Sequence, residues 1–548
     1  MQLSNSKTKN EIGFDHVVNN INVVTPFGKR RIKEIQPFMP GDEGYLEHTL
    51  SQLEVTLDMV EREPRKVDIL REVFMEMKDN TFTIAHSANN ILTVVELFEI
   101  KTLLLQMTAI RDNLISSTIP LPEEFQLHDL LELLNVLDPG KDRLNTFYIY
   151  DVFSEKLTLR RREKRKIELD LRKVQKERRR KVEADYGISM TPKFELPVSK
   201  ADRALIEKVK AIPELMLSEE DYITATFTLK RDETVDLFQM ALDEINEAID
   251  EEELAVQKKL SGRIASYRSL LEENCNRIGE LDFNLAKALY AKENHCVKPD
   301  ITTEYLIEIN EGRQLVVEEI LKRKGKAFCP VTIDLKEGVT CITGANMGGK
   351  TVTLKLVGLC AMLAQHGFFV PCSQAKIGLS SYIHILIGDS QNLQRGLSSF
   401  GSEMEELRVM LEKSKDRTLL LFDELASGTN PAEGLALTKS LVDYLDKKPY
   451  ISLITTHFDH ITGMGVVRNL QVRGLADANF QNLAREIRYA NKRERIEVIG
   501  KYMDYRLFEV DKDQEIPKDA LNIAGMLGIS SEIIEKAKKY MEDRNHEK

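Results

Sequence analysis

Gly338-Val-Thr-Cys-Ile-Thr-Gly-Ala-Asn-Met-Gly-Gly-Lys-Thr351 is the stretch of sequence that decides the fold of the C-terminal half. A β-branched run comes first, a glycine-rich loop follows, and residues 352–361 continue with helical periodicity. The loop matches Gly-x-x-x-x-Gly-Lys-[Ser/Thr] in the strand, loop, helix context of a phosphate-binding P-loop. Backbone N–H groups of such a loop, together with the helix N-terminus, cradle a triphosphate.

The P-loop motif assigns a role to each of its polar or glycine positions. Gly344, Gly348 and Gly349 are expected to let the backbone turn toward the phosphates. Lys350 is expected to reach the β- and γ-phosphates, and Thr351 is expected to ligate Mg²⁺. The sequence therefore predicts a site for a nucleoside triphosphate and its magnesium ion.

Two further apolar runs end in residues that suit nucleotide chemistry. Residues 418–422, Thr-Leu-Leu-Leu-Phe, precede Asp423-Glu424, which is the Walker B arrangement of a buried parallel strand. Asp423 is expected to hold Mg²⁺ through water, and Glu424 to orient and deprotonate the attacking water. Residues 450–454, Tyr-Ile-Ser-Leu-Ile, precede Thr455-Thr456-His457. His457, at the carboxyl end of this neighbouring strand, is expected to sense the γ-phosphate.

The length and the apolar periodicity predict several domains. The 548 residues exceed what one hydrophobic core normally organises. Residues 11–134 carry apolar positions at helical spacing, whereas short apolar runs after residue 299 alternate with helical segments. The expected fold class is an α-helical core with a protruding coiled-coil arm and a C-terminal α/β P-loop domain. The expected domains are residues 1–145, 146–278, 279–300 and 301–548.

The middle of the chain predicts the arm. Residues 145–187 form a very polar helical segment, and residues 233–278 carry a proline-free coiled-coil pattern. Between them we expect a loop at 187–199, a short helix at 201–210 and a strand at 222–229. The alternative is that the two long segments are helices of an ordinary bundle.

Charge is distributed unevenly along the chain. The net charge is -11, yet residues 160–181 hold thirteen Lys/Arg and four Asp/Glu, a local balance of +9. A contact with a polyanion must therefore be local. Arg178, Arg179 and Arg180 are the candidate contacts with DNA phosphates. The alternative is a solvated helix whose charges keep the arm soluble.

Cysteine usage and hydropathy indicate the compartment. The six cysteines include no Cys-x-x-Cys pair, which is typical of buried free thiols in a reducing compartment. Neither a signal peptide nor a membrane span fits the sequence. We expect a cytoplasmic protein without a membrane partner.

Several motifs together resemble the MutS family. They are, in order, Thr343-Gly-Ala-Asn-Met-Gly-Gly-Lys-Thr351, Gly388-Asp-Ser-Gln391, Leu397-Ser-Ser-Phe400, Phe422-Asp-Glu-Leu425, Gly428-Thr429 and Thr455-Thr-His457. The resemblance covers about residues 301–541 and extends more weakly back to residues 12–28. It implies ATP hydrolysis with ATP and Mg²⁺ in a homodimer, whose closing helices at residues 516–539 stabilise the dimer.

The resemblance also implies roles that the spacing of residues does not show. Ser398, with Ser399 beside it, is similar to the signature serine that crosses the dimer interface to the partner's γ-phosphate. Asn346 is expected near the γ-phosphate of its own subunit, and Phe328 on the adenine. We expect a short form of the family, without the N-terminal mismatch-reading and connector domains and without a C-terminal nuclease tail. Mismatch recognition therefore does not follow from the ATPase.

Three hypotheses differ in what the arms hold. The first is a clamp on double-stranded DNA, as in DNA repair by the MutS family. The second is a protein-remodelling factor, such as a reactivase of a cobalamin-dependent aminomutase that works with a partner ATPase. The third is a structural coiled-coil protein with a regulatory nucleotide site, against which Glu424 and His457 argue because both suit turnover. The acidic balance favours the second, whereas the basic arm and the family favour the first, which we adopt.

Overall fold

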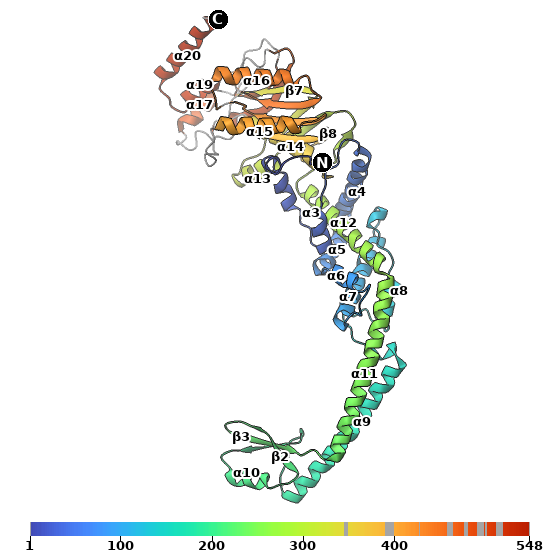
Figure 1. The fold of residues 1–548 in the computed structure, drawn as a ribbon. Coiled ribbons are helices and arrows are strands. Elements are labelled where there is room, and N and C mark those ends of the chain that lie inside the picture. The colour runs from blue at the N-terminus through green and yellow to red at the C-terminus, as the bar shows by residue number, and fades with distance from the viewer. Residues whose placement is uncertain are drawn as a thin grey trace. The chain divides into compact units, whose positions relative to one another are not determined.

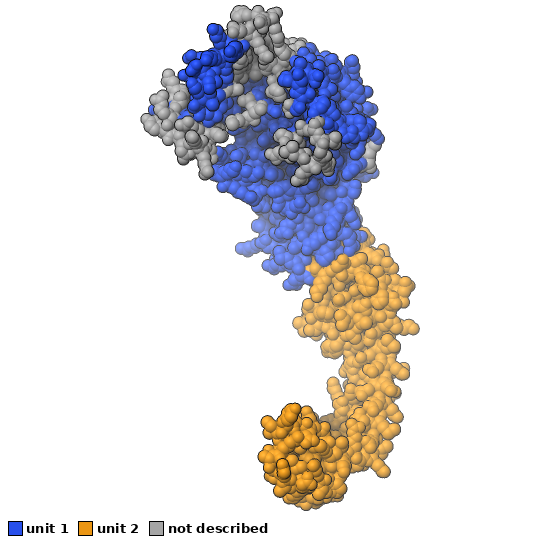
Figure 2. All heavy atoms as spheres, turned by 60° about the vertical axis from the view of Figure 1, so that its left-hand side comes forward, with its two compact units in different colours: residues 1–76, 113–126, 276–548 blue, residues 77–112, 127–275 orange. Residues whose placement is uncertain are grey.

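The computed structural model describes residues 2–344, 349–388, 399–426, 428–456, 464–475, 480–489, 498, 501–510 and 519–546. The chain forms two compact units, coloured in Figure 2. Unit 1 comprises residues 1–76, 113–126 and 276–548, and unit 2 comprises residues 77–112 and 127–275. Residues 1–76 thus belong to the same compact unit as the C-terminal part of the chain, whereas the domains expected from the sequence place them apart.

Six strands of unit 1 form one sheet in the order β13-β12-β7-β11-β10-β9. β13 pairs antiparallel with β12, and the other neighbouring strands pair in parallel. The strands are β7 (Gly338–Thr343), β9 (Tyr382–Ile387), β10 (Thr418–Asp423), β11 (Tyr450–Thr455), β12 (Val467–Gly474) and β13 (Asp504–Glu509). In β10, Leu419 and Leu421 join the core on one face of the sheet, whereas Leu420 and Phe422 join the core on the other. The predicted parallel sheet is therefore present, and it is buried on both faces.

Helix α14 (Lys350–Gln365) lies between this sheet and a second one. The second sheet has the order β4-β8-β5-β6, with β4 (Asp300–Thr302), β5 (Leu306–Gly312), β6 (Val331–Lys336) and β8 (Gln374–Gly378). Ile333 of β6 and Ile383 of β9 belong to the same core cluster as Leu356 and Val357 of α14. A helix that is apolar all round belongs in such an interior. The core therefore fixes where the first turn of α14 lies.

The opposite face of the six-stranded sheet is covered by α15 (Ser399–Lys413) and α16 (Pro431–Leu445). Leu407 and Met410 of α15 pack there with Val442 and Leu445 of α16. Among the described C-terminal residues, further helices are α13 (Leu315–Arg323), α17 (Phe480–Tyr489), α19 (Asp519–Met526) and α20 (Ser531–His546). This C-terminal region is mixed α/β, as the sequence predicts.

The N-terminal helices of unit 1 are α1 (Ser6–Ile12), α2 (Phe14–Asn20), α3 (Pro26–Lys33), α4 (Glu43–Arg62) and α5 (Pro64–Glu76). The first residues lie along β9, because the backbone N–H of Ile383 donates to the carbonyl of Leu3 at 2.8 Å. A side chain on Gly358 of α14 would lie 2.8 Å from Ile12, so glycine permits α1 to approach closely. The start of the chain is thus part of the packing around the P-loop helix.

Unit 2 begins with α6 (Thr81–His86), α7 (Val94–Ile115) and α8 (Leu131–Leu137). Two long helices, α9 (Glu155–Tyr186) and α11 (Glu233–Ser266), then run side by side (Figure 1). Between them in sequence lie α10 (Arg203–Lys210) and a small sheet in the order β1-β3-β2, with β1 (Glu195–Ser199), β2 (Leu215–Glu220) and β3 (Thr224–Leu229). Helix α12 (Arg268–Glu293) follows α11 and ends in unit 1.

The structure corrects several details of the predicted arm. The polar helix begins at Glu155 rather than near residue 145, because the Ser154 hydroxyl caps it by accepting from the Leu157 N–H. The predicted loop at 187–199 contains β1, and Pro197 is tolerated there because β1 is an edge strand. β2 was not predicted. The predicted coiled-coil helix is interrupted at Tyr267, which separates α11 from α12.

The cysteines are free thiols, as the sequence predicts. All six cysteines are free, and all but Cys329 are buried. Within the part of the chain that the structure describes, every helix is too short or too polar to cross a lipid bilayer.

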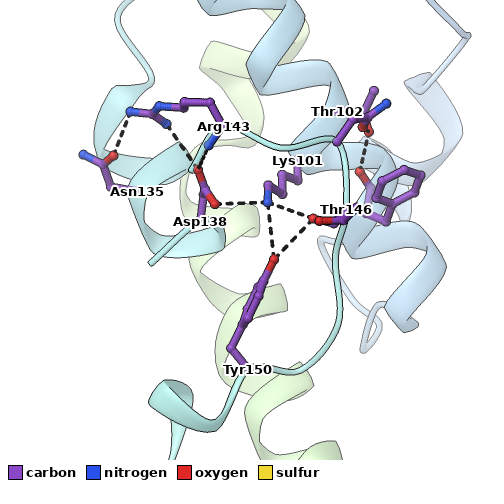
Figure 3. Close-up of polar contacts among 9 residues, drawn as sticks. Lys101, Thr102, Asn135, Asp138, Arg143, Thr146 and Tyr150 are labelled. Atoms are coloured by element: carbon purple, nitrogen blue, oxygen red, sulfur yellow. Dashed lines mark hydrogen bonds and ion pairs between the residues drawn. The ribbon is translucent and has the colours of Figure 1, made fainter. Parts of the chain in front are cut away.

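A buried lysine holds the segment of unit 2 that leads into α9 (Figure 3). The Lys101 side chain on α7 is 1% exposed, and its ammonium donates to Asp138 Oδ1 at 3.1 Å and to the carbonyl of Thr146 at 2.8 Å. The same Asp138 carboxylate accepts from the backbone N–H of Arg143 at 3.0 Å. Both Lys141 and Arg143 have left-handed φ values, 56° and 55°, which non-glycine residues rarely adopt. One buried ion pair thus fixes the irregular segment between α8 and α9.

Replacing Lys101 with Met should leave the Asp138 carboxylate buried without its cation. Loss of one partner of a buried pair destabilises proteins by about 3–5 kcal/mol. We expect the free energy of unfolding of Lys101→Met, measured by denaturant titration, to fall by this amount. The double variant Lys101→Met with Asp138→Asn should recover most of the loss. Lys173→Met, which removes an exposed pair with Asp170, is the control and should change little. Equal stability of Lys101→Met and the wild type would contradict a structural role for the pair.

Candidate active site

The first turn of α14 places Lys350 at the carboxyl end of β7. Its ammonium donates to the carbonyl of Gly344 at 2.7 Å and lies 3.5 Å from Glu424 Oε1. The side chain is only 4% exposed. Gly344 and Gly349 have φ values of 127° and 78°, which a residue with a Cβ adopts only with strain. The described ends of the loop thus have the backbone that its glycines predict.

Thr351 and Asp423 meet where a magnesium ion is predicted. The Thr351 hydroxyl donates to Asp423 Oδ2 at 2.7 Å, and the Thr455 hydroxyl donates to Asp423 Oδ1 at 2.6 Å. The parallel register pairs Asp423 with Thr455, so the ends of β10 and β11 bring these groups together. Hydroxyl and carboxylate oxygens are the ligands that Mg²⁺ prefers, and they fit this ion. Thr455, the last residue of β11, is a site residue to which the motif analysis assigned no role, although it belongs to the quoted motif Thr455-Thr-His457.

Glu424 lies on a strained turn directly after β10. Its φ is 49°, and that of Ala426 is 58°, both in the left-handed region. The Glu424 backbone N–H donates to both the carbonyl and the hydroxyl of Thr455, each at 3.1 Å. Its side chain is 29% exposed, so water can reach the carboxylate. The turn therefore presents Glu424 beside Lys350 while holding its backbone to β11.

A cavity of about 760 Å³ opens beside Lys350 and Thr351. Its wall also includes Phe328 from the segment between α13 and β6, Leu321 from α13, and Tyr505 from β13. A cavity of this size suits a small-molecule ligand. The structure thus brings the predicted adenine residue Phe328 into one cavity with the P-loop lysine. Burial raises the pKa of Tyr505, so its hydroxyl stays protonated.

The comparisons with known proteins agree with this geometry. Residues 340–544 match a family model described as MutS domain V. The C-terminal region is a MutS domain V. MutS domain V is an ABC-type ATPase domain, which implies the use of ATP and Mg²⁺, and MutS family ATPases generally dimerise.

The chain is also similar to curated relatives over part of its length. Endonuclease MutS2 of Acetivibrio thermocellus is 31% identical over 318 residues, which cover 56% of this chain and 37% of that relative. Endonuclease MutS2 of Agathobacter rectalis is 32% identical over 309 residues, which cover 55% of this chain and 36% of that relative. The chain thus spans little more than a third of the length of these relatives.

Several predicted residues of the MutS domain V site lie outside the described residues. They are Asn346, Gly348, Ser398 and His457. Ser399 is the first residue of α15, so the helix begins immediately after the candidate signature serine. The roles of these residues stay predictions. Tyr505 and Leu321 were missed because their segments carry no motif, and only the folded chain brings them to the nucleotide loop.

The three arginines predicted to contact DNA lie on α9 in unit 2 and differ in their surroundings. Arg178 pairs with Asp232 at 3.0 Å and donates to the carbonyl of Lys230 at 2.8 Å. Arg179 lies 3.6 Å from Glu183 and donates to the carbonyl of Thr191. Arg180 is exposed. Two of the three side chains therefore already make contacts within unit 2.

Substitution of Phe328 tests whether the cavity binds the adenine base, and distinguishes recognition of the base from recognition of the phosphates. Stacking of a base on an aromatic ring contributes about 1–3 kcal/mol. Phe328→Ala should therefore weaken ATP binding by about 5- to 150-fold and leave the binding of inorganic tripolyphosphate unchanged, as measured by calorimetry. Phe328→Tyr, which keeps the ring, is the control. An equal loss for both ligands, or none for ATP, would show that Phe328 does not hold the base.

Proposed function

We propose that this chain hydrolyses ATP in a homodimer in which each nucleotide lies between the P-loop of one copy and the signature segment of the other. The observation that carries the proposal is the convergence of Lys350, Thr351, Asp423 and Glu424 at the carboxyl ends of β7 and β10. Ligands of α/β sheets bind at this edge. The four residues supply the cation, the metal ligands and the base that phosphoryl transfer to water needs.

In the proposed reaction a water molecule attacks the γ-phosphorus while the bond to the β,γ-bridging oxygen breaks. Glu424 orients this water and accepts its proton, and Lys350 stabilises the phosphate oxygens. Thr351 and Asp423 would hold Mg²⁺, which neutralises charge on the β- and γ-phosphates. His457 would sense the γ-phosphate from the end of β11, and Asn346 would lie near it.

The dimer rests on two features. Helix α15 begins at Ser399, directly after the candidate signature serine in the sequence, and a helix N-terminus favours a phosphate such as that of a partner's nucleotide. The C-terminal helix α20 carries exposed apolar side chains, with Ile533 60% and Tyr540 73% exposed. Exposed apolar side chains on one helix suit a partner surface. Both features support two-fold pairing of identical copies.

Glu424→Gln tests the proposed hydrolysis. The variant keeps the phosphate cradle and the magnesium ligands but loses the group that accepts the proton. We expect ATP affinity close to that of the wild type, turnover slower by orders of magnitude, and a dimer that retains ATP. Single-turnover kinetics with labelled ATP, together with the mass of the complex in solution, measures all three. Wild-type turnover would mean that Glu424 is not the base.

We further propose that the arms hold double-stranded DNA. The helix α9 carries 14 Lys/Arg and 7 Asp/Glu, and the contacts of Arg178 and Arg179 leave other cations exposed. Arg172, Lys176 and Arg180 are exposed and four residues apart, so they share one face of the helix. Such a row suits the phosphates of a duplex and carries no sequence information. Mismatch recognition and a role in DNA repair are not part of this proposal.

Protein remodelling is the second candidate function, and the charge of α11, the helix beside α9, favours it. The helix α11 carries 9 Asp/Glu and 3 Lys/Arg, so an acidic helix lies beside the basic one. Arg161 of α9 pairs with Glu253 of α11 at 2.6 Å. Acidic charge beside the basic row lowers its attraction for DNA. A protein partner, such as a cobalamin enzyme or a second ATPase, would tolerate a surface of mixed sign.

Reversing the exposed row of α9 separates the two functions. Arg172→Glu, Lys176→Glu and Arg180→Glu together should weaken duplex binding equally for matched and mismatched DNA. Each lost phosphate contact removes about 0.9 from the steepness of log affinity against log salt concentration. The loss of three contacts should therefore make that slope less steep by about three times this amount. ATPase activity without DNA should stay unchanged.

The control reverses three exposed cations of unit 1, Lys29, Lys33 and Arg65, and changes the net charge by the same amount. This control should bind duplex as the wild type does. Fluorescence anisotropy at several salt concentrations gives the affinities. Absence of duplex binding by the wild type at low salt would remove the DNA proposal and favour protein remodelling.

A further inference from the structure

We propose that Glu403 is a positioning residue that links the signature helix α15 to the turn carrying Glu424, an inference that rests on the proposed hydrolysis. Glu403 lies on α15, one turn after Ser399, and is 8% exposed. Its Oε1 accepts from the backbone N–H of Ala426 at 2.9 Å. The remainder of α15, a short connection and the strand β10 separate the two residues in the sequence, so the contact exists only in the folded chain.

The turn that receives this contact is held from both sides. On one side the Glu424 N–H donates to Thr455 at the end of β11, and on the other the Ala426 N–H donates to Glu403. Left-handed φ values at non-glycine residues cost about 1–3 kcal/mol each and persist when the surroundings over-determine them. The turn has two such residues within three positions. The bond to Glu403 is one of the contacts that keep this strained backbone, and hence the Glu424 side chain, in place.

Burial of the Glu403 carboxylate costs free energy, which indicates that this group has a specific role. Burial raises the pKa of Glu403, and the neighbouring charge of Glu406 raises it further. An apolar side chain of similar length would fill the same space beside Leu407 without that cost. Yet such a side chain would leave the buried Ala426 N–H without its acceptor. The acceptor is therefore what position 403 contributes.

The same helix is anchored one turn further along. Glu406 pairs with Lys7 of α1 at 2.6 Å and with His384 of β9 at 3.4 Å. These contacts set the register of α15 against the sheet, so Glu403 meets Ala426 from a defined position. Because α15 begins at the residue after Ser398 in the sequence, the hydrogen bond of Glu403 connects the helix that follows the proposed signature serine to the turn that carries Glu424.

Two substitutions at position 403 test the hydrogen bond. Glu403→Met keeps the volume and removes the acceptor, whereas Glu403→Gln keeps an acceptor oxygen and removes the charge. We expect Glu403→Met to lower kcat by up to about 100-fold, the effect of misplacing a reacting group by roughly 1 Å. KM and the affinity for ADP should stay at wild-type values, and Glu403→Gln should turn over at close to the wild-type rate. Glu405→Met, at an exposed position of the same helix, is the control.

Three results would overturn the inference. They are wild-type kcat in Glu403→Met, a parallel loss of nucleotide affinity and kcat in that variant, and equal impairment of the Gln and Met variants. If Glu403→Met does not fold, Glu403→Asp serves instead, because it keeps the charge and withdraws the acceptor by one methylene. Its kcat should fall with KM unchanged, and a wild-type kcat would equally refute the inference.

Measuring Glu424→Gln in parallel distinguishes a failure of the proposed ATP hydrolysis from a failure of the positioning role of Glu403. If that variant hydrolyses ATP at the wild-type rate, the proposed function itself fails. If Glu424→Gln is slow while Glu403→Met is normal, hydrolysis stands and the positioning role of Glu403 alone is refuted.

Discussion

The enclosure of α14 between two sheets is the constraint on which the rest of unit 1 depends. A helix buried on every side has no freedom to rotate or slide, because each movement would open voids against Ile333 on one side and Ile383 on the other. Its first residue, Lys350, therefore takes its position from the core rather than from the loop before it. The strands β10 and β11 are fixed by the same cluster. Asp423 and Thr455 thus reach α14 as a consequence of packing, before any ligand is bound.

Sequence predicts the chemistry of this site better than its surroundings. The P-loop and the acids after residues 418–422 are short contiguous motifs, which can be recognised in the sequence without knowledge of the tertiary structure. Tyr505 and Leu321 reach the same cavity from segments without a motif, because tertiary packing alone determines their approach. Thr455 lies between these cases, since its motif is visible in the sequence, whereas its two bonds to Asp423 and Glu424 depend on the register of β10 with β11.

In unit 2, apolar periodicity predicts the long helices but not their ends or the small sheet. The long helices α9 and α11 follow from proline-free segments, one very polar and the other with a coiled-coil pattern of apolar positions, and their existence was predictable. Their ends were not, because they depend on single caps such as the Ser154 hydroxyl. The small sheet was largely missed, since β1 contains Pro197, which argues against a strand, and β2 is mostly exposed and lacks a buried alternating pattern. The basic run was visible as charge, yet the pairing of Arg178 and Arg179 within the unit was not.

The position of the first residues along β9 has a practical consequence for handling the protein. β9 is an edge strand, and edge strands that expose unpaired backbone groups recruit other chains. The carbonyl of Leu3 and the hydroxyl of Thr8 occupy the N–H groups of Ile383 and Ile385, so this edge is shielded by the chain's own beginning. Proteolytic trimming of those few residues, or a bulky purification tag fused before them, would uncover a hydrogen-bonding edge of the ATPase sheet. Aggregation, rather than a simple loss of activity, is the failure to look for in such preparations.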